Sequence, residues 1–287
     1  MKNSELSTPL LHELISWGEM QLNHHQIENP HRNVLWMASD LFDCRMSDLP
    51  FSQKPVSYHQ LKTFKKWIGR RVNHEPVQKI TGKTEFYGLT FYLDSGVFIP
   101  RPETERLVDE VLGLITKQNP ISILDVGTGS GCLAVALAKE CENSQITAID
   151  ISTRALKIAK INRDYHELKN IRFKKMDILT ETPKHTYDLV ISNPPYIPKK
   201  DMKFLMPEVI DHDPVLALTD NADGLIFYRY LAKHFHSLVN PNGYMVLETG
   251  SREHSFKAIK IFCHYGYNAD LKKDYSGNHR VLIVQSK

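Results

Sequence analysis

The stretch ISILDVGTGSGCLAVALAKE, residues 121–140, joins an apolar strand pattern to an apolar helix pattern through a loop with three glycines. A short apolar run followed by turn residues is typical of a buried strand in a parallel sheet. In an open α/β sheet, ligands bind beyond the carboxyl ends of such strands. The stretch therefore predicts a strand, a ligand-binding loop and a helix, in that order.

The alternation of strand and helix patterns continues to the end of the chain. Further strands are predicted over residues 146–151, 171–178, 187–193, 243–250 and 279–287. Helices are predicted over residues 131–140, 152–165, 224–235 and 255–266. Such alternation predicts an α/β fold, a doubly wound, mainly parallel sheet with helices on both faces.

The N-terminal part of the chain has a different pattern. Apolar residues recur at helical spacing up to about residue 75, and Ser57 stands where it can cap the third helix. Residues 80–99 are rich in aromatic and β-branched residues between glycines, which predicts a β-hairpin. We expect a helical domain over residues 1–75, a hairpin and PRPETE linker over 76–105, and a catalytic domain over 106–287.

Composition describes an ordinary soluble globular protein. The 287 residues carry a formal net charge of +3, too small to indicate nucleic-acid binding or a membrane surface. The four cysteines contain no CxxC pair, so no metal site is expected. No apolar run is long enough to span a membrane and the N-terminus has no signal-peptide pattern. A cytoplasmic location is expected.

The glycine loop and the next acid indicate a nucleoside cofactor. Asp150 ends the second strand, where a carboxylate accepts hydrogen bonds from a ribose diol, a group that NAD and S-adenosylmethionine (SAM) share. Two details favour SAM: the loop has GxGxG rather than GxGxxG spacing, and Asp125 precedes its first glycine. The predicted loop residues are Gly127, Thr128, Gly129, Ser130 and Gly131.

Two residues after the third strand extend this prediction. Asp177 stands where its side chain can reach an adenine amino group, and Ile178 where it can pack on the ring. An ordinary turn or capping role for Asp177 is the alternative.

The sequence ISNPPYIPKK, residues 191–200, ends the fourth strand with a turn poor in hydrogen-bond donors. A methyl acceptor with an –NH₂ group has two hydrogens to place. The side-chain oxygen of Asn193 can accept one and the carbonyl of Pro194 the other, while Pro194 and Pro195 contribute no competing N–H group. Tyr196 offers a flat face for a planar amide or base.

Such a turn suits methyl transfer to a weak nucleophile. An amide nitrogen gains positive character as it attacks, so its N–H groups become better donors. Acceptors fixed beforehand therefore bind the transition state more tightly than the ground state. No strong general base is required.

With these residues assembled, the sequence resembles the release factor glutamine methyltransferase family over nearly the whole chain. The motifs that carry the resemblance are EPVQKITGKTEFYG (75–88), FIPRPETE (98–105), LDVGTGSG (124–131), ISNPPYIP (191–198), DPVLAL (213–218), DGLIFYR (223–229) and DYSGNHRVLIV (274–284). The family commonly has Glu where this chain has Asp213, and some members have an aromatic ring at the position of Ile178.

The resemblance implies a class I SAM-dependent methyltransferase domain, Rossmann-like, behind a small helical domain and a hairpin hinge. It implies methylation of the glutamine in the GGQ loop of class I peptide chain release factors, at N5. The glycine loop and Asp150 would hold the cofactor, and Asn193 would touch both ligands. The segment from Asn193 to Tyr196 would grip the glutamine, with Asn193, Pro194 and Tyr196 as the catalytic residues. Phe98 and Arg101 would lie near the site.

Three alternatives stay open at this point. A sister glutamine methyltransferase acting on a ribosomal protein shares the NPPY turn and the glycine loop. An amino methyltransferase acting on RNA or DNA shares NPPY, although the weak net charge argues against direct nucleic-acid contact. The third is a binding module without turnover. We expect a monomer with no membrane contact.

Overall fold

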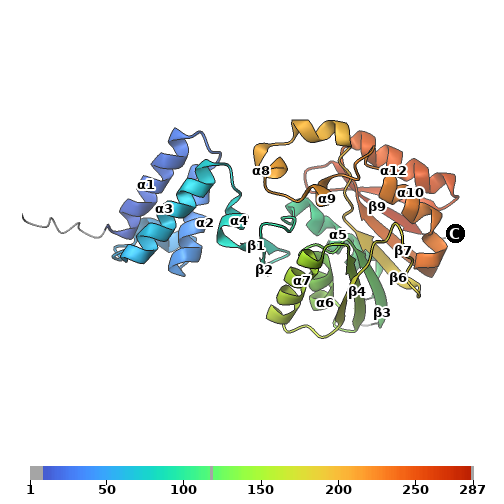
Figure 1. Ribbon diagram of the computed structural model, residues 1–287. Helices are drawn as coiled ribbons and strands as arrows, with labels where there is room; N and C mark the ends of the chain where they lie inside the picture. Colours follow the sequence, from blue (N-terminus) through green and yellow to red (C-terminus); the bar gives the residue numbers. More distant parts are fainter. Residues whose placement is uncertain (1–8, 117–118, 286–287) are drawn as a thin grey trace, which may run out of the picture. The chain divides into compact units, whose positions relative to one another are not determined.

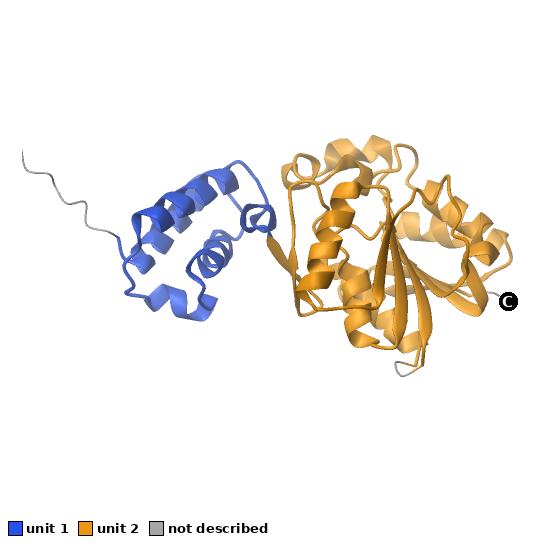
Figure 2. Ribbon diagram, turned by 60° about the horizontal axis from the view of Figure 1, so that its bottom comes forward, with its two compact units in different colours: residues 1–82 blue, residues 83–287 orange. Residues whose placement is uncertain are grey.

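The computed structural model describes residues 9–116 and 119–285, and the chain divides into two compact units after Gly82 (Figure 2). The first unit is helical. Its elements are α1 (Leu11–His24), α2 (Pro30–Phe42), the 3-10 helix η1 (Met46–Phe51), α3 (Tyr58–Val72) and α4 (Val77–Thr81). The helix α4 extends this unit beyond residue 75, because Val77 and Ile80 are buried in the same apolar core as the longer helices.

Helix α3 shows how the sequence forms this unit. The Ser57 hydroxyl accepts a hydrogen bond from the amide of Gln60 at 3.3 Å, so the predicted cap is present. Phe64 and Ile68, one turn apart, are buried, whereas Lys65 and Lys66 are exposed. The helix therefore buries one apolar stripe and leaves Lys65 and Lys66 in solvent, whereas Arg71 is buried and donates to Asn33.

The second unit begins with the predicted hairpin of β1 (Lys83–Phe86) and β2 (Leu89–Tyr92). Its two turn residues, Tyr87 and Gly88, both have positive φ, as a tight two-residue hairpin turn requires. The PRPETE segment then forms the 3-10 helix η2 (Pro102–Thr104), which leads directly into α5 (Glu105–Leu114).

A seven-stranded sheet forms the centre of this unit, in the order β5-β4-β3-β6-β7-β9-β8 (Figure 1). Its strands are β3 (Ile121–Val126), β4 (Ser144–Asp150), β5 (Ile171–Lys175), β6 (Tyr187–Ser192), β7 (Val239–Glu248), β8 (Asn268–Lys273) and β9 (His279–Gln285). The first five pair in parallel and β9 pairs antiparallel with β7 and β8. This arrangement confirms the predicted fold class.

The edge strand β8 is a difference from the predicted pattern. Its sequence NADLKK is polar, so it has no apolar run that would predict a strand. It forms because the adjacent strand β9 supplies backbone hydrogen-bond partners along its length.

Helices cover both faces of the sheet, as neighbouring strand residues show. Ile123 packs in a core with α5 and α6 (Cys132–Glu140), whereas Leu124 packs in a second core with α10 (Ile226–Lys233) and α12 (Arg252–His264). Side chains alternate across a strand, so both faces are apolar and need cover. The remaining helices are α7 (Thr153–Tyr165), α8 (Pro207–Ile210), α9 (Val215–Leu218) and α11 (Phe235–Leu238), with the 3-10 helix η3 (Lys199–Phe204) after β6.

The strand order places the switch point of the sheet at β3. The chain runs outward from β3 through β4 to β5, then returns to β6 on the other side of β3. Loops that leave the carboxyl ends of these strands diverge there and form a crevice.

Within residues 9–116 and 119–285, no group of three His, Cys, Asp or Glu side chains is placed to hold a metal ion. No helix in these segments is long and apolar enough to cross a membrane.

Candidate cofactor and substrate site

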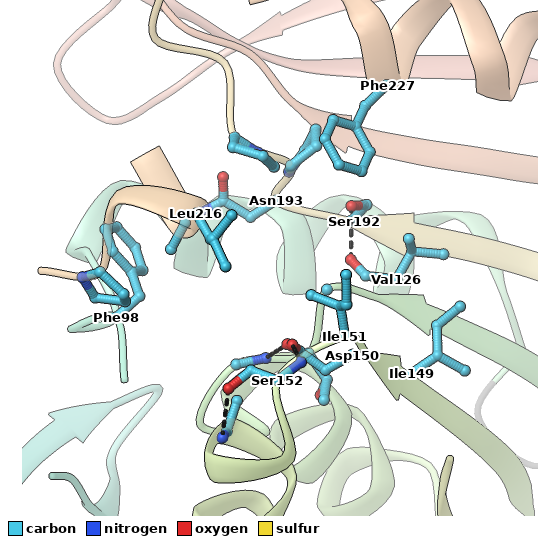
Figure 3. Close-up of a pocket in the computed structure, with 18 of the residues that line it drawn as sticks. Phe98, Val126, Ile149, Asp150, Ile151, Ser152, Ser192, Asn193, Leu216 and Phe227 are labelled. Atoms are coloured by element: carbon cyan, nitrogen blue, oxygen red, sulfur yellow. Dashed lines mark hydrogen bonds between the residues drawn. The ribbon is translucent and has the colours of Figure 1, made fainter. Parts of the chain in front are cut away.

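A cavity of about 310 Å³ lies at the carboxyl ends of β3, β4, β5 and β6 (Figure 3). Its walls come from the glycine loop, from the residues after β4, β5 and β6, and from segments around residues 96–104 and 214–221. Of the predicted residues, Gly127, Thr128, Gly129, Ser130, Asp150, Asp177, Ile178, Asn193, Pro194 and Pro195 line this cavity. Gly131 and Tyr196 do not.

The glycine loop is attached to the neighbouring strand by its own amides. The amides of Gly127 and Thr128 donate to the carbonyl of Ile149 at 2.9 and 3.0 Å. Gly131 has a φ of 83° at the start of α6, and a Cβ there would lie 3.1 Å from the Cβ of Ala159. Gly131 thus permits close packing of α6 on α7, outside the cavity.

Asp150 has a fixed carboxylate at the end of β4. Its Oδ2 accepts from the amide of Gly129 at 2.9 Å, and its Oδ1 accepts from the amide of Ser152 at 2.8 Å (Figure 3). Burial raises the pKa of Asp150, and these amide hydrogen bonds oppose that shift. A carboxylate has about four acceptor positions, so both oxygens keep capacity for a diol.

Asp125 lies beneath the loop rather than on the cavity wall. Its Oδ2 accepts from the hydroxyl of Thr128 at 2.6 Å, while its Oδ1 has no hydrogen-bond partner of standard geometry among the described residues. Complete burial raises the pKa of Asp125 to about 7. The carboxyl group therefore orders the loop through Thr128.

Much of the remaining cavity wall is apolar. Ile178 is buried and lines the cavity. Ile149, Ile151, Leu216 and Phe227 also line it (Figure 3). Asp177 accepts from the amide of Leu179 at 3.0 Å, so it forms a local turn at the rim. The apolar wall suits the planar ring of a cofactor.

Asn193 is held through a chain of buried side chains that sequence reasoning missed. Its Nδ2 donates to the Thr104 hydroxyl at 3.2 Å, and Thr104 donates to Oε2 of Glu248 at 2.6 Å. The Tyr196 hydroxyl donates to Oε1 of the same carboxylate at 3.2 Å. Glu248 ends β7, beside β6 in the sheet, and an acid that ends an apolar strand run was the signal that could have identified it.

Tyr196 points away from the cavity. Its hydroxyl contacts Glu248, and its ring lies beside His254 with 5.8 Å between ring centroids. That the Tyr196 ring provides a flat surface for a planar substrate group stays a prediction.

The hydroxyl of Ser192 donates to the carbonyl of Val126 at 2.7 Å, which holds β6 against β3 directly before the NPPY turn.

Phe98 and Arg101 differ in their relation to the site. Phe98 lines the cavity, whereas Arg101 stacks over the Phe98 ring and pairs with Oδ2 of the buried Asp213 at 2.5 Å. The amide of Ile99 also donates to Asp213, at 3.4 Å. Asp213 therefore attaches the segment before α9 to the chain around Phe98.

Models of known protein families match the sequence of both units. The family model described as Methyltransferase small domain matches residues 89–220, and that of the PrmC N-terminal domain matches residues 13–82. A Fusobacterium nucleatum protein named release factor glutamine methyltransferase is 34% identical over 92% of this chain and 75% of its own length.

Two further comparisons cover less. A Rickettsia typhi protein named bifunctional methyltransferase is 35% identical over 80% of this chain, which spans 48% of that protein. Among solved structures, a methyltransferase from Pyrococcus furiosus has a TM-score of 0.53 at 17% identity, covering 70% of this chain and 90% of its own. That likeness concerns the fold.

Proposed function

This chain belongs to the release factor glutamine methyltransferase family, and we propose that it methylates the GGQ glutamine of class I peptide chain release factors at the side-chain nitrogen N5, with SAM as methyl donor. One observation supports this most directly. Asp150 and Asn193 line the same cavity from strands on either side of β3. Asp150 is suited to bind a ribose diol, and Asn193 is suited to bind an amide whose nitrogen accepts the methyl group.

The residues present fit SAM. The Asp150 carboxylate, held by two amides, would accept from the ribose hydroxyls, and Ile178 would border the adenine with Asp177 at the rim. Thr128 and Ser130 line the wall formed by the glycine loop, and the unsatisfied oxygen of Asp125 lies beneath it. A cationic amino-acid end would place positive charge near that acid.

When bound, SAM would supply an electrophilic methyl group on a sulfonium for bonding to the glutamine nitrogen, with the neutral thioether as leaving group. Asn193 and Pro194 position the nitrogen by accepting its two N–H groups, one at the side-chain oxygen and one at the backbone carbonyl. The nitrogen gains positive character, and one N–H proton then passes to water. Fixed acceptors stabilise this charge as it develops.

The helical unit supports a role in substrate selection. It matches the PrmC N-terminal domain, and we propose that it contacts the release factor outside the GGQ loop. We propose a monomer that acts in the cytoplasm without direct nucleic-acid contact, in agreement with the net charge of +3. Deleting the unit from a protein whose remainder still folds should weaken release-factor affinity.

Mass spectrometry tests the proposed function. Purified class I release factor is incubated with SAM and this protein, with ribosomal protein and RNA as parallel substrates. We expect one added methyl on the GGQ glutamine, lost in Asn193→Ala while that variant still binds SAM. Methylation of the ribosomal protein or RNA instead would overturn the substrate and retain the transfer chemistry.

A further inference from the structure

We propose that Thr104 and Glu248 are positioning residues for methyl transfer, which orient the Asn193 amide so that its oxygen, not its –NH₂ group, faces the acceptor nitrogen. This inference rests on the proposed function for its chemistry, but its geometry stands on the hydrogen bonds of the second unit alone.

The direction of each hydrogen bond follows from the number of protons available. A carboxylate only accepts, and the two oxygens of Glu248 accept from Thr104 and Tyr196. The single hydroxyl proton of Thr104 is used toward Glu248, so toward Asn193 this oxygen can only accept. The Asn193 side chain must therefore present Nδ2 to Thr104 and turn Oδ1 the other way.

Burial makes this orientation costly to reverse. Glu248 is 1% exposed and Thr104 is 2% exposed, and the Glu248 carboxylate keeps two hydroxyl donors in this setting. A flipped Asn193 amide would place its oxygen against the oxygen of Thr104, with no hydrogen between them. A buried polar group without a partner is disfavoured, so one amide orientation dominates.

The same chain of donors responds to charge on the substrate nitrogen. As the N–H group of the substrate donates more strongly to Oδ1 of Asn193, the –NH₂ group of Asn193 becomes a stronger donor to Thr104. Thr104 in turn donates more strongly to the negative charge of Glu248. Hydrogen-bond chains in a low-dielectric interior strengthen one another in this way, so Glu248 assists the transfer without touching the substrate.

The kinetic test uses shape-matched substitutions. Thr104→Val removes the hydroxyl and keeps the side-chain shape, while Thr104→Ser keeps the hydroxyl. Thr84→Val is the matched control, because Thr84 is a buried threonine of β1 that does not line the cavity. We expect kcat to fall about ten- to hundredfold in Thr104→Val, with the SAM dissociation constant within about twofold. Thr104→Ser and Thr84→Val should stay within about threefold of the parent kcat.

A second readout requires no turnover. In ¹⁵N-labelled protein, the side-chain amide signal of Asn193 is assigned by its loss in Asn193→Ala. Its two protons should be distinct and exchange slowly with water in the parent and in Thr104→Ser. They should shift and exchange faster in Thr104→Val and in Glu248→Gln.

The outcomes separate the two proposals. An unchanged amide signal in both Thr104→Val and Glu248→Gln overturns the positioning role, and so does parent-like kcat in Thr104→Val. Absence of release-factor methylation by the parent protein overturns the proposed function instead, and the amide signal then still decides the positioning role. A thermal-unfolding curve for each variant identifies any that fail to fold, and Thr104→Ser is the conservative substitute.

Discussion

Gly224 is in backbone contact with Tyr196: a Cβ on Gly224 would lie 2.2 Å from the carbonyl oxygen of Tyr196. Gly224 also has a φ of 79°, which side chains rarely adopt. Its carbonyl accepts from Nε2 of His254 at 2.9 Å, and the His254 ring neighbours the Tyr196 ring. The DGL turn therefore supports the NPPY turn from behind.

Gly224→Ala tests this contact. The substitution combines strained backbone with a clash against main chain, so we expect a loss of at least about 2 kcal/mol in the free energy of unfolding. Turnover should fall as the NPPY turn shifts. Gly113→Ala is the control, because Gly113 lies in α5 with open space around it, and a helical alanine should be neutral or stabilising. Urea unfolding curves measure both, and equal stability of the two variants would contradict the contact.

Asp150→Asn should weaken SAM binding about ten- to hundredfold. The substitution keeps the shape of the side chain but removes the negative charge and one acceptor from the ribose site. Isothermal titration calorimetry measures the dissociation constant. Asp164→Asn is the control, because the Asp164 side chain is exposed on α7 and pairs with its neighbour Arg163. If Asp150→Asn binds SAM as tightly as the parent, the Asp150 carboxylate only holds the glycine loop in place.

Asp213→Asn should destabilise the protein by about 1–2 kcal/mol. The buried carboxylate accepts from Arg101 and from the amide of Ile99, and a neutral amide serves the guanidinium poorly. The Arg101 side chain is about a third exposed, at 32%, so solvent reduces the effect. Asp270→Asn, in an exposed pair with Lys272, should change the free energy of unfolding by less than about 0.5 kcal/mol. Chemical denaturation measures the free energy of unfolding of both variants. Similar decreases in the two would argue against the attachment of the segment before α9 through Asp213.

The free energy of unfolding should depend on pH through Glu248. Burial raises the pKa of Glu248 to about 7, from an ordinary value of 4.5. Between these values the folded protein binds more protons than the unfolded chain, so stability from this group falls as pH rises from about 4.5 to 7. Asp125, with its pKa also raised to about 7, acts in the same direction. His254, whose burial lowers its pKa, acts in the opposite direction.

Comparison with Glu248→Gln isolates the carboxyl group from these other contributions. Denaturant unfolding at pH 5, 6, 7 and 8 should show a steeper decline in the parent than in Glu248→Gln. Parallel curves would show that the pKa of Glu248 is the same in the folded and unfolded states.

Activity should have the opposite dependence on pH. The donor chain to Asn193 requires the Glu248 carboxylate, so kcat should fall as pH drops below about 7. Among neighbouring titratable groups, Arg280 of β9 and Tyr196 lower the pKa of this carboxyl group, and Glu103 of η2 raises it. A kcat profile from pH 5.5 to 8.5 measures the acidic limb, which Glu248→Gln should remove. An identical limb in that variant would assign it to another group.

The strand-loop-helix pattern of residues 121–140 and the later alternation were sufficient to predict the sheet, because parallel buried strands require continuous apolar runs. The residues that end those strands line the cavity, because the carboxyl ends of parallel strands lie at the same edge of the sheet. Asp150 and Asn193 were found in this way although the sheet places them on different strands.

The local sequence was insufficient wherever a role depends on a distant partner. The polar strand β8 exists because β9 lies beside it. Tyr196 turns from the cavity because its hydroxyl donates to Glu248 and its ring packs beside His254. Thr104 and Glu248 are separated by 144 residues and become partners only in the fold.

By itself the sequence determined the α/β architecture, the glycine loop and the acceptor turn, because each depends on residue types within a short span. The sequence also predicted that the Asn193 oxygen accepts from the substrate, but only the tertiary structure decided which side chains hold the Asn193 amide in that orientation. That choice depends on the protons of Thr104 and on a buried carboxylate brought from another strand, and hydrogen-bond direction is set by neighbours in space.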